Sequence, residues 1–212
     1  MVKIKFCGLK RPEEVRWAEE LKADFVGFNL YPESPRYVSP AELKKLAGEV
    51  KTAQKVLVFV NSSLAEIVRA AAESGADIIQ LHGDETPRFC SRVMVKTKRP
   101  VIKAFRLANE KDLKLLEEYL DSADYFLLDA RTKGLYGGTG RLFPWNLAVK
   151  AKMLEKPIFL AGGLTAENVT EACRQIMPFA VDVSGGIEKK PGVKSKKMMT
   201  LFAQKVSISG IL

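Results

Sequence analysis

The chain has 212 residues, of which 47% are hydrophobic and 28% charged, a balance that excludes an intrinsically disordered protein. Its net charge of +9 comes from basic and acidic residues that are interspersed along the sequence, so a basic but mixed surface is the simplest interpretation. The apolar stretches are far shorter than the roughly 20 residues of a membrane helix, and the N-terminal sequence MVKIKFCGLK lacks a signal-peptide core. We therefore expect a cytoplasmic protein that does not enter the membrane.

Short apolar runs alternate with longer amphipathic stretches along the whole chain. The predicted strands cover residues 3–7, 25–30, 55–60, 78–81, 101–105, 125–129, 158–161 and 179–183. They are apolar through most of their length, as strands buried on both faces of a parallel sheet are.

Helix-start signals lie between these strands. Ser39 and Glu42 enclose Pro40 in a predicted capping box, and Ser63 with Glu66 repeats the pattern. Further helices are expected to begin near Pro12, Asn109 and Thr165, and a last one covers 194–205.

Eight strands in 212 residues give one strand for about every 26 residues, the size of a strand–helix unit with short loops. The pattern predicts an α/β protein with one (β/α)8 TIM barrel domain over residues 1–212. An open, doubly wound sheet is the alternative, although the Gly-x-Gly-x-x-Gly fingerprint that often accompanies it is absent after the first strand.

The functional residues of such barrels lie where the strands end. Gly162 and Gly163 follow the seventh predicted strand, and Ser184, Gly185 and Gly186 follow the eighth. Backbone N–H groups of paired glycines can close on an anion, and the loops after these two strands are a common phosphate site. A phosphorylated small-molecule substrate is the resulting hypothesis; the alternative is that the glycines only form tight turns.

Cys7 ends the first predicted strand and Asp129 ends the sixth. A thiol, with an ordinary pKa of about 8.5, can act as a base or a nucleophile, or be an ordinary buried cysteine. A lone carboxyl after three apolar residues is costly to bury without a purpose and can serve as a general acid, or it can cap a helix or form a salt bridge. Together, a thiol base and a carboxylic acid at one barrel mouth suit isomerisation by proton transfer.

Two further side chains are candidates for substrate binding. Arg36, in a stiff Ser-Pro-Arg segment, can present its guanidinium to a carboxylate or lie solvated at the surface. His82, the single histidine, follows the fourth strand as a site residue or a structural loop residue. The spacing of His, Asp, Glu and the three Cys residues predicts neither a metal site nor a disulfide framework.

The motifs at the ends of the predicted strands resemble, in the same order along the chain, those of the phosphoribosylanthranilate isomerase family. The matching segments are KFCG at 5–8, SPRYV at 34–38, QLHGDE at 80–85, LD at 128–129 with GGTG at 137–140, LAGGL at 160–164 and VDVSGG at 181–186. The chain departs from the family at Phe6, where Ile is usual, and at Gly185, where many members have a second serine.

The resemblance implies a cofactor-free barrel that rearranges N-(5-phosphoribosyl)anthranilate to 1-(o-carboxyphenylamino)-1-deoxyribulose 5-phosphate. It implies that Asp129 is the general acid and Cys7 the general base, that Arg36 binds the anthranilate carboxylate, and that the glycines with Ser184 hold the phosphate. A monomer or a homodimer fits the resemblance. The alternatives are another phosphosugar isomerase or epimerase on the same barrel, and a nucleic-acid-binding protein, which only the net charge suggests.

Overall fold

The computed structural model describes residues 1–130 and 144–209. Its eight parallel strands close into a barrel in chain order, with β1 hydrogen-bonded to both β2 and β8. The strands are β1 (Lys3–Cys7), β2 (Phe25–Asn29), β3 (Gln54–Phe59), β4 (Ile78–Leu81), β5 (Val101–Leu107), β6 (Tyr125–Ala130), β7 (Ile158–Leu160) and β8 (Ala180–Val183). The predicted (β/α)8 barrel is confirmed, and the open-sheet alternative is wrong because β1 and β8 pair directly.

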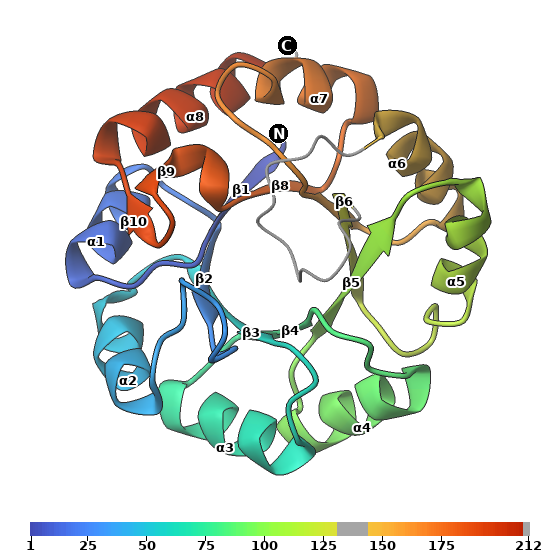
Figure 1. Cartoon of the computed structure of the whole chain (residues 1–212), viewed down its shortest axis with the longest axis horizontal. Helices are drawn as coiled ribbons and strands as arrows, with labels where there is room; N and C mark the ends of the chain where they lie inside the picture. Colours follow the sequence, from blue (N-terminus) through green and yellow to red (C-terminus); the bar gives the residue numbers. More distant parts are fainter. Residues whose placement is uncertain (131–143, 210–212) are drawn as a thin grey trace.

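Helices surround the barrel on its outer side (Figure 1). They are α1 (Pro12–Glu20), α2 (Pro40–Glu49), α3 (Leu64–Ser74), α4 (Pro87–Thr97), α5 (Lys114–Glu117), α6 (Trp145–Ala151), α7 (Val169–Ile176) and α8 (Lys196–Ser209), with the short 3-10 helices η1 (Glu110–Leu113), η2 (Lys152–Leu154) and η3 (Gly185–Ile187). Both predicted capping boxes form: the Ser39 and Ser63 side chains accept from the backbone N–H groups of Glu42 and Glu66. Among the described residues, no helix has the length and apolar character needed to cross a bilayer.

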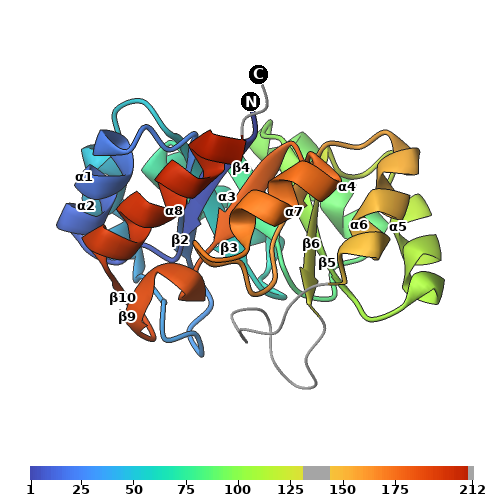
Figure 2. The ribbon, with the colours of Figure 1, turned by 90° about the horizontal axis from the view of Figure 1, so that it is seen from above.

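Several segments differ from the sequence predictions. The last helix begins at Lys196 rather than at 194, because Val193–Lys194 form a strand. Asn109 caps a 3-10 turn that leads into the four-residue α5 rather than a long helix. The Asn168 side chain binds backbone atoms of Thr165 and Gly163, and this turn delays the start of α7 to Val169. A two-stranded hairpin, β9 (Glu188–Lys190) and β10 (Val193–Lys194), was not predicted; Figure 2 shows it at the end of the barrel where the parallel strands finish.

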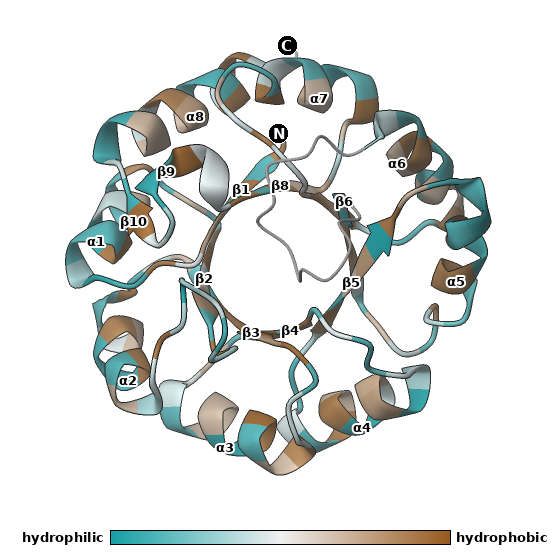
Figure 3. Cartoon of the chain, in the orientation of Figure 1, coloured by the Kyte–Doolittle hydropathy of each residue, from teal (hydrophilic) through white to brown (hydrophobic). Residues whose placement is uncertain are grey.

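The apolar core has two layers. Figure 3 shows that the strands of the barrel are mostly hydrophobic, whereas the helices mix hydrophobic and hydrophilic residues. The larger layer fills the space between strands and helices and includes Ile4 and Phe6 of β1. The smaller layer plugs the barrel interior, where Phe25 and Phe159 pack edge to face with ring centroids 5.1 Å apart. Because side chains alternate along a strand, burying Ile4 and Phe6 outside the barrel turns Lys5 and Cys7 to its inside.

Candidate active site

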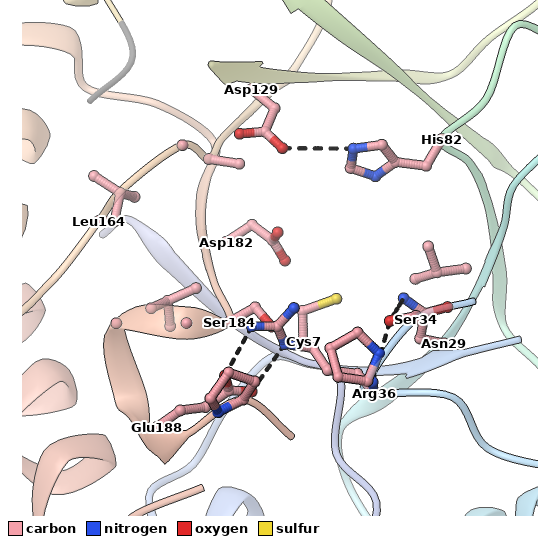
Figure 4. A pocket seen from close by; sticks show the side chains of 18 of the residues that line it. Cys7, Asn29, Ser34, Arg36, His82, Asp129, Leu164, Asp182, Ser184 and Glu188 are labelled. Carbon is pink, nitrogen blue, oxygen red and sulfur yellow. Dashed lines mark hydrogen bonds and ion pairs between the residues drawn. The ribbon is translucent and has the colours of Figure 1, made fainter. Parts of the chain in front are cut away.

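A cavity of about 570 Å³ opens at the carboxyl ends of the strands. All nine predicted site residues line it: Cys7, Arg36, His82, Asp129, Gly162, Gly163, Ser184, Gly185 and Gly186. They come from loops and strand ends that are distant in sequence, so the barrel brings them together as its topology requires. Figure 4 shows Asp129 and His82 on one side of this cavity and Cys7 on the other.

The Cys7 thiol is 9% exposed and lies at the end of β1, beside a buried ion pair. In that pair Lys5 Nζ donates to Asp182 Oδ1 over 2.6 Å. Burial raises the pKa of the Cys7 thiol above its ordinary value, and the nearby Asp182 carboxylate adds to this effect. The ammonium groups of Lys5 and Lys194 act in the opposite direction and favour the thiolate, although burial outweighs them.

Asp129 and His82 form the opposite wall. Asp129 Oδ2 lies 3.5 Å from His82 Nε2, and both side chains are about one-tenth exposed or less. The other imidazole nitrogen, Nδ1, lies 2.9 Å from the Gln80 side-chain amide nitrogen. The imidazole thus lies between the Gln80 side-chain amide and the Asp129 carboxyl group, with one ring nitrogen toward each.

The glycine loops after β7 and β8 form the third part of the cavity. Gly162 and Gly163 have φ values of +84° and +70°, a conformation that other residues rarely adopt. A Cβ atom at Gly186 would overlap the Leu164 carbonyl oxygen, so the two loops touch through this glycine. This contact brings the loops after β7 and β8 together at the wall of the cavity that they line.

A network of buried charged side chains contacts the loop after β8, at Ser184. Glu188 accepts from Arg36 Nε and Nη2 over 2.8 and 2.7 Å and from Lys194 Nζ over 2.7 Å. Lys194 Nζ also donates to the Ser184 carbonyl oxygen and hydroxyl, over 3.1 and 3.2 Å. Burial alone would raise the pKa of the Glu188 carboxyl, but Arg36 and Lys194 outweigh it and the net pKa lies below the ordinary value.

Comparisons with known proteins identify the family of this chain. A family model described as N-(5'-phosphoribosyl)anthranilate isomerase matches residues 4–205. This chain belongs to that family. A relative of the same name from Geobacter metallireducens is 41% identical over 97% of this chain and 98% of its own length.

Solved structures of the family have the same fold. Phosphoribosyl anthranilate isomerase from Thermotoga maritima has a TM-score of 0.90 and 34% identity, over 98% of this chain and 99% of that one. Another structure, the isomerase in complex with reduced 1-(o-carboxyphenylamino)-1-deoxyribulose 5-phosphate, has a TM-score of 0.87 and 33% identity over the same shares.

Sequence reasoning did not assign a role to four charged residues in and beneath the cavity. Lys5, Asp182, Glu188 and Lys194 are buried and paired, but a lysine or glutamate in a sequence usually indicates a solvated side chain. The signal for Lys5 was its position two residues before Cys7, which puts both side chains on the same face of β1. The glycines Gly134, Gly137, Gly138 and Gly140 that follow Asp129 lie outside the described residues.

Within residues 1–130 and 144–209, no cluster of three or more His, Cys, Asp and Glu side chains has the geometry of a metal site. The three cysteines are free thiols.

Proposed function

We propose that this chain is an N-(5'-phosphoribosyl)anthranilate isomerase that acts in tryptophan biosynthesis. The observation that carries the proposal is the pairing of a thiol, Cys7, and a carboxyl group, Asp129, on opposite sides of one cavity whose third wall is a pair of glycine loops. A phosphorylated sugar held by these loops has its reacting carbons between an acid and a base.

Asp129 is the general acid that opens the sugar ring. Its carboxyl group donates a proton to the furanose ring oxygen, the bond from that oxygen to the first sugar carbon breaks, and the amine lone pair forms an iminium. His82 Nε2 lies 3.5 Å from Asp129 Oδ2, so the imidazole is placed to orient the carboxylate that remains. Asp129 is only 6% exposed, so the proton transfer takes place in a partly desolvated site.

Cys7 is the general base for the second step. The thiolate removes the proton from the second sugar carbon, and the electron pair of that C–H bond forms a carbon–carbon double bond while the iminium becomes an amine. The resulting enolamine then tautomerises to the ketone, with a proton added at the first carbon. The adjacent iminium acidifies the C–H bond, which makes a thiolate a sufficient base.

Two sites hold the anionic ends of the substrate. Gly162, Gly163 and the Ser184–Gly185–Gly186 loop bind the phosphate through backbone N–H groups and the Ser184 hydroxyl. Arg36 binds the anthranilate carboxylate: Glu188 holds its Nε–Nη2 edge, which leaves the Nη1–Nη2 edge for the substrate.

The remaining expectations accompany this activity. We propose that residues 1–212 form one catalytic domain that works as a monomer or homodimer in the cytoplasm, with no cofactor, metal or nucleic acid. The basic residues are dispersed along the chain, so the net charge of +9 does not indicate a nucleic-acid partner.

Turnover by the purified chain tests the proposal. Phosphoribosylanthranilate is generated in situ from anthranilate and phosphoribosyl pyrophosphate, and its disappearance is followed by fluorescence. We expect loss of the fluorescent substrate at a rate proportional to the concentration of the chain. Correctly folded protein that leaves the substrate unchanged would refute the proposal, and the cavity would then have to serve another phosphosugar.

A further inference from the structure

We propose that Lys5, which does not line the cavity, is a positioning residue for the reaction. Its ammonium group is the counter-ion that stabilises the Cys7 thiolate inside the barrel. This inference rests on the proposed function, because it explains how a buried thiol can serve as the base of that reaction.

Three residues of β1 and β2 bring the two groups together. Cys7 is the register partner of Gly27 on the neighbouring strand, and Lys5 precedes Cys7 by two residues on the same face of β1. A Cβ atom at Gly27 would lie 2.9 Å from Cys7 Sγ and 3.3 Å from Lys5 Nζ. The sulfur and the ammonium therefore both pack into the space that this missing side chain leaves, next to each other.

The second partner of Lys5 fixes its position. Asp182 is the register partner of Lys5 on β8, and its carboxylate accepts from Nζ over 2.6 Å. The Lys5 side chain is fully buried, a costly place for a cation unless anions surround it. An ammonium has three N–H donors, so Lys5 can serve the Asp182 carboxylate and the Cys7 sulfur at the same time.

The other charges around Cys7 do not replace this cation. Lys194 of β10 is already bound to Glu188 and Ser184, and Arg36, in the loop after β2, is bound to Glu188. Across the cavity, Asp129 faces His82. Lys5 thus makes the largest contribution that favours the thiolate, ahead of Lys194, while burial and Asp182 oppose it.

The charge balance predicts the direction of the effect. With Lys5 present, the Cys7 thiolate and the Asp182 carboxylate share one cation. Without Lys5, two anions stand side by side in the barrel, and Cys7 keeps its proton to a higher pH. Burial alone would lower the pKa of Lys5, but Asp182 and Cys7 raise it above its ordinary value, so the anions around Lys5 favour its ammonium form.

The pH dependence of Cys7 alkylation measures this coupling without any substrate. Iodoacetamide reacts with thiolates, and peptide mass spectrometry separates Cys7, which lines the cavity, from the buried Cys90 and Cys173. In Lys5→Met we expect alkylation of Cys7 at pH 8 to slow by at least about tenfold and the profile to move to higher pH, since one pKa unit changes the thiolate fraction about tenfold.

Two further variants keep the test decisive if Lys5→Met alone does not fold. Lys5→Met/Asp182→Asn removes both charges of the pair, and we expect a rate between those of Lys5→Met and wild type, because Lys5 affects Cys7 more than Asp182 does. The matched control, Lys103→Met/Glu85→Gln, removes a different buried ion pair, in which Lys103 Nζ lies 2.8 Å from Glu85 Oε2, and it should leave the pH profile of Cys7 unchanged.

The proposal would be overturned if the pH profile of Cys7 alkylation in folded Lys5→Met/Asp182→Asn coincided with that of wild type or moved to lower pH. An equal shift of the Cys7 profile in Lys103→Met/Glu85→Gln would also overturn it, because any loss of a buried ion pair would then produce the effect. In turnover, Lys5→Met should lower kcat about tenfold with little change in KM. If wild type shows no turnover, the proposed function fails, but the alkylation profiles still report on the coupling of Lys5 and Cys7.

Discussion

Replacing Glu188 by Gln tests the charge network that holds the Ser184 loop. The Glu188 side chain is 3% exposed and accepts three hydrogen bonds from two cations, the Arg36 guanidinium and the Lys194 ammonium. A glutamine offers one acceptor oxygen and points an N–H donor at a cation. Removing one partner of a buried ion pair typically costs about 3–5 kcal/mol, and we expect Glu188→Gln to lower the free energy of unfolding by that amount at pH 7.

The loss of unfolding free energy in Glu188→Gln should also depend on pH, in a direction that can be predicted. Burial raises the pKa of Glu188, but Arg36 and Lys194 hold the net pKa in the folded state below the ordinary value of about 4.3. The stabilisation by the carboxylate is therefore complete above that ordinary pKa and is lost as the pH falls through the lower, folded-state pKa. The difference in stability between wild type and Glu188→Gln should be constant near neutrality and narrow on acidification.

Urea unfolding at a series of pH values measures both effects. The control is Glu20→Gln, which removes an exposed ion pair with Lys196 whose side chains are 56% and 52% exposed; such pairs contribute at most about 1 kcal/mol. A loss for Glu188→Gln no larger than for Glu20→Gln at pH 7, or a gap that does not narrow in acid, would refute the reasoning.

Three further substitutions have defined outcomes. Ser63→Ala removes the cap that accepts from the Glu66 N–H and should cost about 1 kcal/mol in urea unfolding; no loss would contradict the capping role. Gly186→Ala forces the loop away from the Leu164 carbonyl and should raise KM for the phosphorylated substrate; an unchanged KM would remove this loop from the phosphate site. Arg36→Lys loses the planar fork and should lower kcat/KM about ten- to a hundredfold, roughly 1.5–3 kcal/mol; wild-type kinetics would contradict carboxylate binding.

The fold could be predicted because its signals are local. A run such as 56–59 is apolar because both faces of the strand are buried, and Ser63 with Glu66 marks a helix start regardless of the rest of the chain. The start of α7 could not be placed in the same way. It depends on the Asn168 side chain, which binds the backbone of the preceding loop instead of continuing the helix from Thr165.

The same difference between local and long-range signals applies to the residues of the site. Cys7 and Asp129 could be identified because they end predicted strands, and parallel strands end at the same mouth. The contact between Lys5 and Asp182 joins residues 177 positions apart and exists only because β1 and β8 close the barrel in one register. A sequence pattern does not contain that register, so it cannot show that two apparently ordinary charged residues are buried together.

Cys7 and Asp129 are proposed to act as the base and the acid of one isomerisation. Turnover by three variants is the most direct test of this pairing. We predict that Cys7→Ala and Asp129→Asn each lower kcat by about 10²–10⁴-fold, the usual contribution of a positioned acid or base. The matched control, Cys173→Ala, removes a buried thiol on α7 and should keep wild-type kcat when the enzyme is folded. A folded Cys7→Ala or Asp129→Asn enzyme with wild-type kcat would contradict the claim.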